Sequence, residues 1–476
     1  MKKVLIMNRY HRNRLLFGGA LVITQILTST SAGLAQSLVA STEVVTEART
    51  TTKAISTGAK YSDPQTGMTA EQAVAYALEH NGELQAARKE MEAARALVKQ
   101  ASLRANPRVD ASVAKTIRGM DNTVTIQGML PLELGRRRTT RIRVAENELE
   151  MRLQDVANRE RLLAAEVRAK FGEAIAAILK LGLDQDLIDT SQRGYNLVAA
   201  RVTEGGTAPL EQNMVLVELN RLRSMRETAE GKTQTAMLEL RNLIGMSPDA
   251  PLQLRGDFDN LITPLLSVAE ATGRALAERP DLKLVIAAES LAEARIEQAR
   301  AQGKFDASLT AGYQRMDSGF PLNGINDAGQ LQPVQSTFHY LMFGVSLDLP
   351  VRNKNQGAIE AALAEAEAAK LRRDFTVLTI RREVATAYAQ FNSASRAAEI
   401  FRVGVKDQAN ANLNIVRQTY ELGSKTLIDY IGEQRRFIDL ENSYIDTLLD
   451  TYKARVEVER AVGSSSVIKP ETQTHE

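Results

Sequence analysis

The chain carries the same order of elements twice, and this duplication constrains its fold more than any other feature. Asn81-Gly82-Glu83-Leu84 corresponds to Arg279-Pro280-Asp281-Leu282, at a spacing of 198 residues. Further on, Glu166-Val167 corresponds to Glu383-Val384, and residues 201–206 correspond to 418–423, both at a spacing of 217. The second copy therefore holds 19 additional residues, and we assign them to the Gly/Asn/Asp/Pro-rich stretch 317–335 as a loop insertion. Duplication of this kind is typical of folds in which one copy cannot bury its apolar face alone.

Long helical patterns fill most of each copy. Between Arg141 and Thr203, apolar residues recur at steps of three, four and seven, which predicts a single helix. A helix of some 60 residues would span roughly 95 Å, far more than a typical globular helix. The other predicted helices are about 69–103 and 208–244 in the first copy, and about 268–301, 357–420 and 426–462 in the second.

Each copy also contains one pair of segments with the alternating pattern of β-strands. We predict β-hairpins at 107–132 and 305–349, with strands of roughly ten residues, the length that a membrane barrel strand needs. Four strands cannot close a barrel, and open sheet edges are not tolerated in hydrocarbon. If these strands enter a membrane, the barrel must be shared, and three subunits would supply twelve strands. A soluble sheet packed on helices is the alternative.

The two ends of the chain are expected to lie outside the duplicated region. Basic residues followed by an apolar run from Leu15 to Leu27 indicate a secretory signal over 1–35, cleaved after Ala35. The alternative is an uncleaved anchor, but a run of about 13 residues is short against the ~20 of a spanning helix. We expect an irregular segment over 36–68, the first copy over 69–263, the second over 264–463, and a disordered tail over 464–476.

Composition excludes several classes of function. The chain has no cysteine, which excludes disulfides and thiolate metal sites, and its four histidines form no cluster. Loss of the five basic residues of the signal changes the net charge from +2 to −3, which argues against nucleic acid as a partner. Neither a phosphate-binding loop nor a nucleophile elbow is present. We therefore expect no enzyme, no cofactor and no resident metal.

The duplicated order of strands and helices, with glycine corners at 205–206 and 423, resembles the TolC-like outer-membrane efflux factors from about residue 69 to 463. Within that family, Pro131-Leu132-Glu133-Leu134-Gly135-Arg136-Arg137-Arg138 and the opening of 81–87 resemble the heavy-metal branch typified by CzcC. The resemblance implies a homotrimer in the outer membrane of a Gram-negative-type cell, with a twelve-stranded barrel and a long periplasmic α-helical tunnel. Such trimers are passive ducts. Their partners are a periplasmic adaptor, an inner-membrane proton-driven pump of the RND type, and outer-membrane lipid.

The same resemblance implies where the duct docks and closes. The hairpin tips would lie at 204–207 and 421–425, where Gly205, Gly206 and Gly423 reverse the chain and where the adaptor docks. A carboxylate that faces the pore in this family corresponds to Asp429. The family's second carboxylate position holds Gly432 here, and Glu433 follows it.

Threefold symmetry would turn each pore-facing carboxylate into a ring that attracts cations. Contacts that hold the aperture shut in the family correspond to Glu211, Tyr420 and Lys425, with a possible Glu211–Lys425 ion pair. The alternative is that these three residues, together with Asp429 and Glu433, are solvated surface groups.

These observations predict the outer-membrane exit duct of a tripartite efflux system that exports heavy-metal cations. The same duct serving drugs, solvents or type I protein secretion is an alternative. A periplasmic coiled-coil adaptor or structural protein is an alternative of another class. An adaptor would contain one helical hairpin, however, and this chain has two tips and two strand pairs.

Overall fold

The computed structural model describes residues 60–463, apart from 118, 120 and 259–264. The predicted signal over 1–35, most of the predicted irregular segment over 36–68, and the predicted tail over 464–476 lie outside the described residues. All described residues belong to one compact unit.

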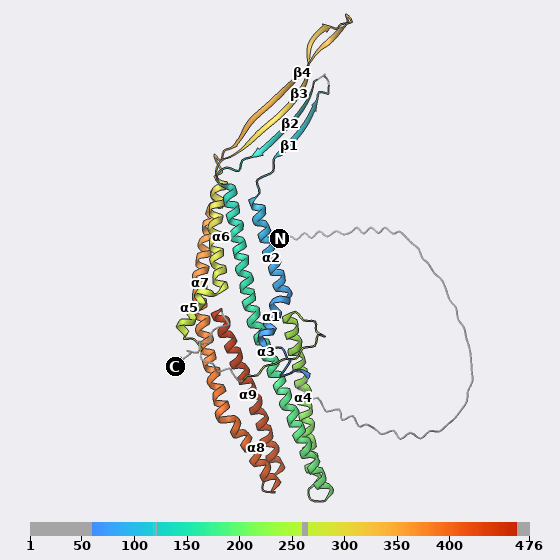
Figure 1. Ribbon diagram of the computed structural model, residues 1–476, viewed down its shortest axis with the longest axis vertical. Helices are drawn as coiled ribbons and strands as arrows, with labels where there is room; N and C mark the ends of the chain where they lie inside the picture. Colours follow the sequence, from blue (N-terminus) through green and yellow to red (C-terminus); the bar gives the residue numbers. More distant parts are fainter. Residues whose placement is uncertain (1–59, 118, 120, 259–264, 464–476) are drawn as a thin grey trace, which may run out of the picture. The chain divides into compact units, whose positions relative to one another are not determined.

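The described part of the chain is mainly helical with four antiparallel strands, which confirms the predicted fold class (Figure 1). The first copy contains α1 (Ala70–His80), α2 (Gly82–Ser102), β1 (Arg108–Lys115), β2 (Asn122–Pro131), α3 (Arg137–Thr203) and α4 (Pro209–Ile244). The second contains α5 (Val268–Glu278), α6 (Pro280–Gln302), β3 (Asp306–Ile325), β4 (Leu331–Asp348), α7 (Gln356–Ile400), α8 (Lys406–Glu421) and α9 (Leu427–Val462).

The first predicted helix of each copy is in fact two helices. The backbone leaves the helical conformation at Asn81, with ψ of 121°, and at Arg279, with ψ of 125°. Asn81 accepts a hydrogen bond from the Leu84 amide at 3.0 Å and so caps α2. Arg279 precedes Pro280, and a residue before proline is disfavoured in the helical region. The predictions of single helices over 69–103 and 268–301 were therefore wrong at these two corners.

The long helix of the second copy is also interrupted. Val167 and Phe171 in α3, and Val384 and Tyr388 in α7, are all buried, which supports the spacing of 217 residues in this region. At the tips, however, the residues that share a φ of +78° are Gly205 and Gly423, at a spacing of 218. The second copy thus contains one residue more than the first between Tyr388 and Gly423. The chain accommodates this residue in a π-helical turn over 401–405.

Two sequence predictions are corrected by this turn. The helix predicted over 357–420 is not continuous, because α7 and α8 are separated by the π-helical turn, whereas α3 runs without a break. The sequence comparison paired Gly206 with Gly423, but the structure makes Gly205 the counterpart of Gly423.

Deletion of Gly404 is expected to convert the π-helical turn to regular α-helix and to leave the melting temperature unchanged or raised. Removing the one additional residue restores the 3.6-residue period without rotating the segments on either side. Deletion of Gly182, in the uninterrupted α3, is the matched control. It should rotate the rest of α3 by about 100° and lower the melting temperature sharply. Thermal unfolding followed by far-UV circular dichroism checks both, and equal losses of stability in the two variants would contradict this assignment.

Each copy has its own apolar core. In the first, α1, α3 and α4 meet the segment around Leu252 and Leu254, and Ile445 of α9 joins them. In the second, α5, α7 and α9 meet. The buried side chains of the two cores include Val167, Phe171, Leu181, Met237, Ile244, Ile380, Val384, Tyr388, Val458 and Val462.

The strands form one sheet in the order β1-β2-β3-β4, in which β2 pairs with β3 and so joins the two copies. The ladder between β3 and β4 extends to Ile325 and Leu331. The stretch 317–335 was predicted as an irregular loop, and this was wrong, since most of it prolongs the two strands. Figure 1 shows this pair continuing past the ends of β1 and β2.

One face of the sheet is apolar and exposed. Residues directly opposite each other in an antiparallel pair share a face, and Ala111 pairs with Ile126, which pairs with Tyr313, which pairs with Leu341. Val113, Leu341 and Phe343 on this face are 74%, 75% and 82% exposed. The opposite face is more polar, with Asp110, Ser112, Gln127, Thr310 and Ser346, although it also carries Met129, Tyr340 and Met342.

Both edges of the sheet are open. Within the residues that the structure describes, β1 pairs only with β2, and β4 pairs only with β3. Over the same residues, no helix has the length and apolar character needed to cross a membrane.

Candidate functional site

The candidate site is the tip region, defined here as the turns at 204–208 and 422–426 with the adjoining ends of α3, α4, α8 and α9. Gly205 and Gly423 each adopt a φ of +78° after the last helical turn. Gly206 then donates to the Arg201 carbonyl at 2.8 Å, and Ser424 donates to the Thr419 carbonyl at 2.9 Å. These bonds close both helices in the same way. A Cβ at Gly205 or Gly423 would meet open space, so backbone conformation alone requires glycine there.

A tyrosine joins the two hairpins of one subunit at the tips. The Tyr420 hydroxyl donates to the Glu211 carboxylate at 3.3 Å, and the Tyr420 ring stacks on Tyr430 with centroids 5.9 Å apart. Burial and the nearby Glu211 carboxylate raise the pKa of Tyr420, so its hydroxyl keeps its proton and remains a donor. Lys425 is exposed and forms no ion pair among the described residues of one chain. The predicted Glu211–Lys425 pair between neighbouring hairpins is thus not formed within one chain, and such a pair between hairpins of different subunits stays a prediction.

The two candidate aperture carboxylates have different surroundings. Asp429 is exposed and belongs to the capping box of α9, where its carboxylate accepts hydrogen bonds from the Thr426 hydroxyl at 2.8 Å and the Thr426 amide at 3.0 Å. These bonds lower the pKa of Asp429, which favours the charged form. Glu433 is paired with Arg436 at 2.9 Å, and its side chain is only 15% exposed. The structure thus leaves Asp429 available to solvent and commits Glu433 to an intrahelical pair.

A buried carboxylate above the tips was not predicted. Glu218 of α4 is 3% exposed and lies 2.7 Å from Arg221 and 2.7 Å from Arg435 of α9. Burial acts to raise the pKa of Glu218, but hydrogen bonds from both arginines outweigh it and lower the pKa. Nearby, the Gln434 amide donates to the Ser191 hydroxyl at 2.9 Å. The sequence did contain one signal for this site, because Glu218 is a charged residue next to Leu219 in the apolar seam of α4.

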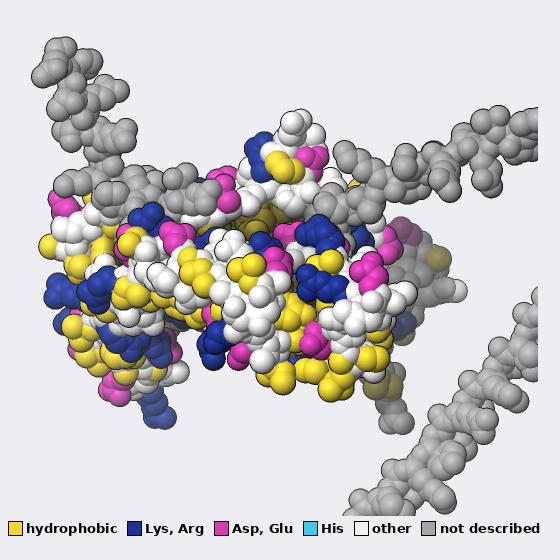
Figure 2. Space-filling model, turned by 90° about the horizontal axis from the view of Figure 1, so that it is seen from below, with side chains coloured by type: hydrophobic (Ala, Val, Ile, Leu, Met, Phe, Trp, Pro, Cys, Tyr) yellow, Lys and Arg dark blue, Asp and Glu magenta, His cyan; other side chains and the backbone are white. Residues whose placement is uncertain are grey.

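Between the hairpins at this level lies a small cavity of about 290 Å³, lined by Ser191, Val198, Glu218, Tyr420 and Gln434 among others. Viewed from the tip end, acidic and basic side chains are interspersed with apolar ones (Figure 2). The tip region therefore combines incomplete packing with contacts that are few and polar.

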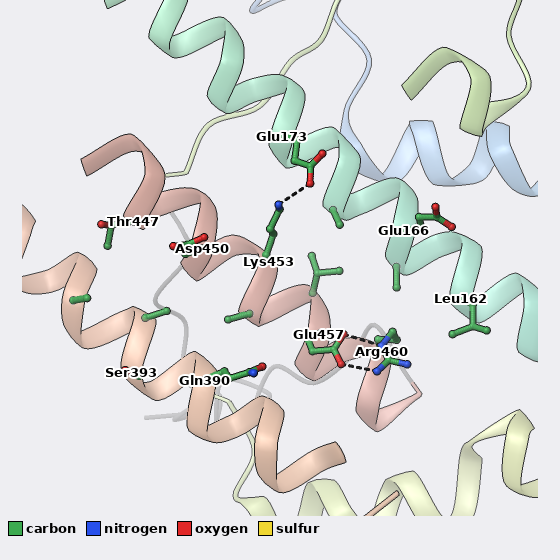
Figure 3. A pocket seen from close by; sticks show the side chains of 16 residues that line it. Leu162, Glu166, Glu173, Gln390, Ser393, Thr447, Asp450, Lys453, Glu457 and Arg460 are labelled. Atoms are coloured by element: carbon green, nitrogen blue, oxygen red, sulfur yellow. Dashed lines mark hydrogen bonds and ion pairs between the residues drawn. The ribbon is translucent and has the colours of Figure 1, made fainter. Parts of the chain in front are cut away.

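A larger groove of about 1000 Å³ runs between α3, α7 and α9 (Figure 3). Four of its charged groups pair with one another, since Lys453 lies 2.6 Å from Glu173 and Arg460 lies 2.5 Å from Glu457. Glu166 and Asp450 also line the groove. Across the described residues, no set of three or more His, Cys, Asp or Glu side chains is arranged to hold a metal ion.

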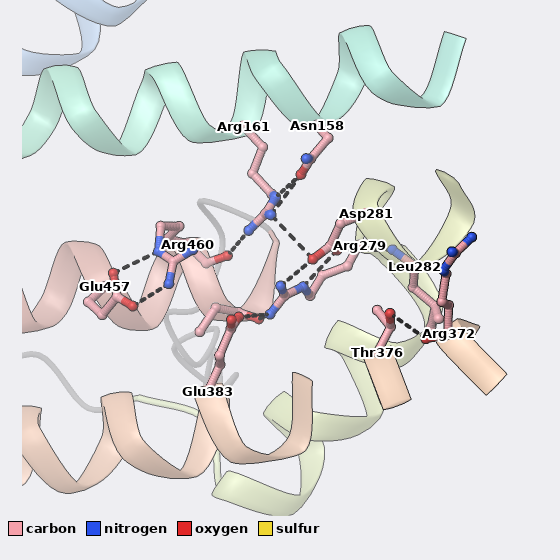
Figure 4. A network of polar contacts seen from close by, with 11 residues as sticks. Asn158, Arg161, Arg279, Asp281, Leu282, Arg372, Thr376, Glu383, Glu457 and Arg460 are labelled. Atoms are coloured by element: carbon pink, nitrogen blue, oxygen red, sulfur yellow. Dashed lines mark hydrogen bonds and ion pairs between the residues drawn. The ribbon is translucent and has the colours of Figure 1, made fainter. Parts of the chain in front are cut away.

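A buried arginine fixes the corner of the second copy (Figure 4). Arg279 is 2% exposed, donates to the Ala461 carbonyl at 2.9 Å and pairs with Glu383 at 2.8 Å and with Asp281. Arg161 of α3 lies 3.6 Å from Asp281 and donates to the Arg460 carbonyl, so the cluster also joins the two copies. Asn81 has the corresponding position in the first copy and donates to the Leu243 carbonyl at 2.9 Å.

Comparison with known proteins agrees with this architecture. A family described as "Outer membrane efflux protein" matches residues 73–246 and 271–464, one match to each copy. The cobalt-zinc-cadmium resistance protein CzcC of Cupriavidus metallidurans is 24% identical over 396 residues, which cover 83% of this chain and 90% of that protein.

Solved structures share the fold. The structure of CusC superposes with a TM-score of 0.69 at 17% identity, covering 83% of this chain and 92% of that one. The CmeC outer membrane channel of Campylobacter jejuni superposes with a TM-score of 0.68 at 15% identity, covering 83% and 85%.

Proposed function

Because the chain belongs to the outer membrane efflux protein family, we propose that three copies assemble into the passive exit duct of a tripartite efflux system. The observation that carries this proposal is the four-stranded sheet, which has one exposed apolar face and two unpaired edges among the described residues. A sheet with open edges is not stable in hydrocarbon, but closure around a threefold axis removes every edge. Pairing of β1 with β4 of the next subunit gives twelve strands.

The two faces of the sheet then have separate roles. The apolar face, with Val113, Leu341 and Phe343, faces lipid, and the face with Gln127 and Thr310 lines the exit. The helices form the periplasmic tunnel, and the two hairpin tips with Gly205, Gly206 and Gly423 receive a periplasmic adaptor. Energy comes from an inner-membrane RND-type pump, and the duct itself catalyses no reaction. The duplicated units of this assembly are residues 69–263 and 264–463.

We further propose that the cargo is heavy-metal cations. Two features support this cargo: the likeness to a protein named for cobalt, zinc and cadmium resistance, and the basic motif of residues 131–138 after β2, which resembles the heavy-metal branch of the family. In cells that lack the gene, sensitivity to cobalt, zinc or cadmium should rise, and the intact chain should restore resistance. Unchanged metal tolerance with increased sensitivity to drugs or solvents would assign the duct to another cargo.

Replacing Asp429 by Asn is expected to reduce the cation selectivity of single channels in planar bilayers by several-fold, because a ring of three exposed carboxylates attracts cations. Hydrogen bonds from Thr426 lower the pKa of Asp429 within one chain, which favours the charged carboxylate at neutral pH. Glu433→Gln is the matched control, since that carboxylate is engaged by Arg436. Identical selectivity in wild type and Asp429→Asn would exclude Asp429 from the aperture.

A further inference from the structure

The hairpin of β3 and β4 extends far beyond the sheet that the other strands form. The last pair between β2 and β3 is Asn122 with Asp317, whereas β3 and β4 continue pairing to Ile325 and Leu331. We call residues 318–335, which lie beyond that last pair, the ribbon. On both sides of the ribbon, the described residues offer no further strand, so its two edges are open.

Several large apolar side chains of the ribbon are exposed. Leu322, Ile325 and Leu331 are 67%, 75% and 73% exposed, and Phe320 is 40% exposed. In the whole ribbon only Asp327 is charged. Natural proteins usually protect open strand edges with charges, proline or short length, and Pro321 and Pro333 protect part of these edges. The large apolar side chains remain exposed, however, and exposed apolar patches usually mark an interaction surface.

The base of the ribbon is fixed rather than loose. The Gly319 amide donates to the Asp121 carboxylate at 2.7 Å, which ties the ribbon to the turn between β1 and β2. Phe320 packs edge-to-face on Phe338, with centroids 6.4 Å apart. The register changes between Gly319 and Asn323, and such irregularities bend a strand pair. The ribbon thus leaves the sheet at a fixed point, Gly319, and the irregular pairing that follows this residue bends it.

The length of the ribbon matches the width of the exit. This step rests on the proposed trimer. Twelve strands spaced about 4.8 Å apart and tilted by about 40° enclose a barrel roughly 24 Å across. The eight residues from Ser318 to Ile325 span about 26 Å at 3.3 Å per residue. A ribbon that bends inward at its base is thus long enough to reach the threefold axis, about 12 Å from the barrel wall.

We propose that the three ribbons of the trimer converge over the exit and pack against one another through Ile325 and Leu331, which share one face of the ribbon, so that the partner of each ribbon is the same ribbon of a second copy. Leu331 belongs to β4, the strand that pairs with β1 of the neighbouring subunit in the proposed barrel. The open edge of the ribbon on this side is therefore a continuation of the edge that joins two subunits. With one charge per ribbon, like-charge repulsion between copies is small. The assembled ribbons form an apolar cap outside the barrel, opposite to the end that the hairpin tips close.

Cysteine cross-linking tests the contact directly, because the natural chain contains no cysteine. Ala328 lies in the turn at the end of the ribbon, where the Gly329 amide donates to the Asn326 carbonyl. Oxidation of Ala328→Cys in outer-membrane vesicles should yield a covalent dimer, since three equivalent cysteines at one axis form one disulfide. Ser318→Cys, at the base of the ribbon, is the matched control and should stay monomeric in denaturing gels.

The oligomeric mass is measured on the same extracted samples, and this separates two kinds of failure. A trimer in which Ala328→Cys does not cross-link overturns the ribbon contact and leaves the proposed duct intact. A monomer contradicts the proposed function itself. Quenching of a fluorophore on Ala328→Cys by spin-labelled lipid would place the ribbon in the membrane surface and would also overturn the contact.

A shortened ribbon tests the cap. Ser318 pairs with Ser336, so replacing residues 319–335 by Asn-Gly leaves a two-residue hairpin turn in register. Gln127→Cys, on the polar face of β2, reports access to the exit from outside the cell. An impermeant maleimide should label it several-fold faster in the shortened variant than in the full chain. Equal labelling rates would overturn the cap.

Discussion

Replacing Arg279 by Ala is expected to destabilise the protein by about 3–5 kcal/mol, because it removes one partner from a buried set of charges. Arg279 is 2% exposed and is the shared partner of Asp281 and Glu383, which belong to α6 and α7. Without the guanidinium, Glu383 would lose its ion-pair partner and Asp281 would keep only Arg161. The Ala461 carbonyl at the end of α9 would also lose its donor.

Thermal unfolding of the detergent-purified protein measures this effect, with Arg300→Ala as the matched control. Arg300 forms a pair with Glu297 at 2.9 Å, but both side chains are about half exposed, and such pairs contribute about 0–1 kcal/mol. We expect a large decrease in melting temperature for Arg279→Ala and almost none for Arg300→Ala. Similar small decreases in both variants would show that the corner of the second copy does not depend on Arg279.

Replacing Gly245 by Ala is the second change with a large expected effect, roughly 3 kcal/mol. Gly245 ends α4 with a φ of +82°, and a side chain in that conformation costs about 1–2 kcal/mol. A Cβ there would also lie 2.5 Å from the His80 carbonyl oxygen, so the corner between α1 and α2 would have to shift. Such overpacking typically costs about 1–3 kcal/mol.

Gly205→Ala separates the two contributions to this loss. Gly205 has a similar φ of +78° at the first hairpin tip, but nothing lies within 4 Å of the position that its Cβ would occupy. This variant should lose only the conformational part, about 1–2 kcal/mol. If Gly205→Ala and Gly245→Ala lowered the melting temperature equally, close packing of α4 on His80 would not contribute to stability.

Periodicity predicted the helices and the strand pairs well, because both repeats are long and regular. The apolar steps from Leu149 to Ile178 predicted a helix that the structure contains as part of α3. Alternation around Val109 and Leu341 predicted the hairpins for the same reason. The corners at Asn81 and Arg279 had local signals, a capping asparagine and a following proline, which the long helical pattern outweighed in the prediction. Contacts with the ends of α4 and α9, more than 150 residues away, add to these local causes and could not be predicted from the sequence.

Insertions were harder to predict than elements. The 19 additional residues of the second copy were placed correctly at 317–335 but were expected to be irregular, because Gly, Asn and Pro there indicate turns. Pairing with the opposite strand overrode these local preferences. The single additional residue at 401–405 left no local signal, since a π-helical turn keeps the helical pattern on both sides.

The candidate site depended more on resemblance than on periodicity. Asp429 and Tyr420 were found through the family, and the structure adds their partners, Thr426 and Glu211. Glu218 was missed because its role needs Arg435 from a helix that is distant in sequence. The roles of Asp429 and Glu433 at an aperture, and of Glu211, Tyr420 and Lys425 in closing it, remain predictions.

Native mass spectrometry of the detergent-extracted protein measures whether other copies of the chain complete the open four-stranded sheet and cover its apolar face. A mass of three chains, stable when the detergent is diluted, is the predicted result. A stable monomer, with β1 and β4 both unpaired and the apolar face exposed, would contradict the shared barrel and the duct that depends on it.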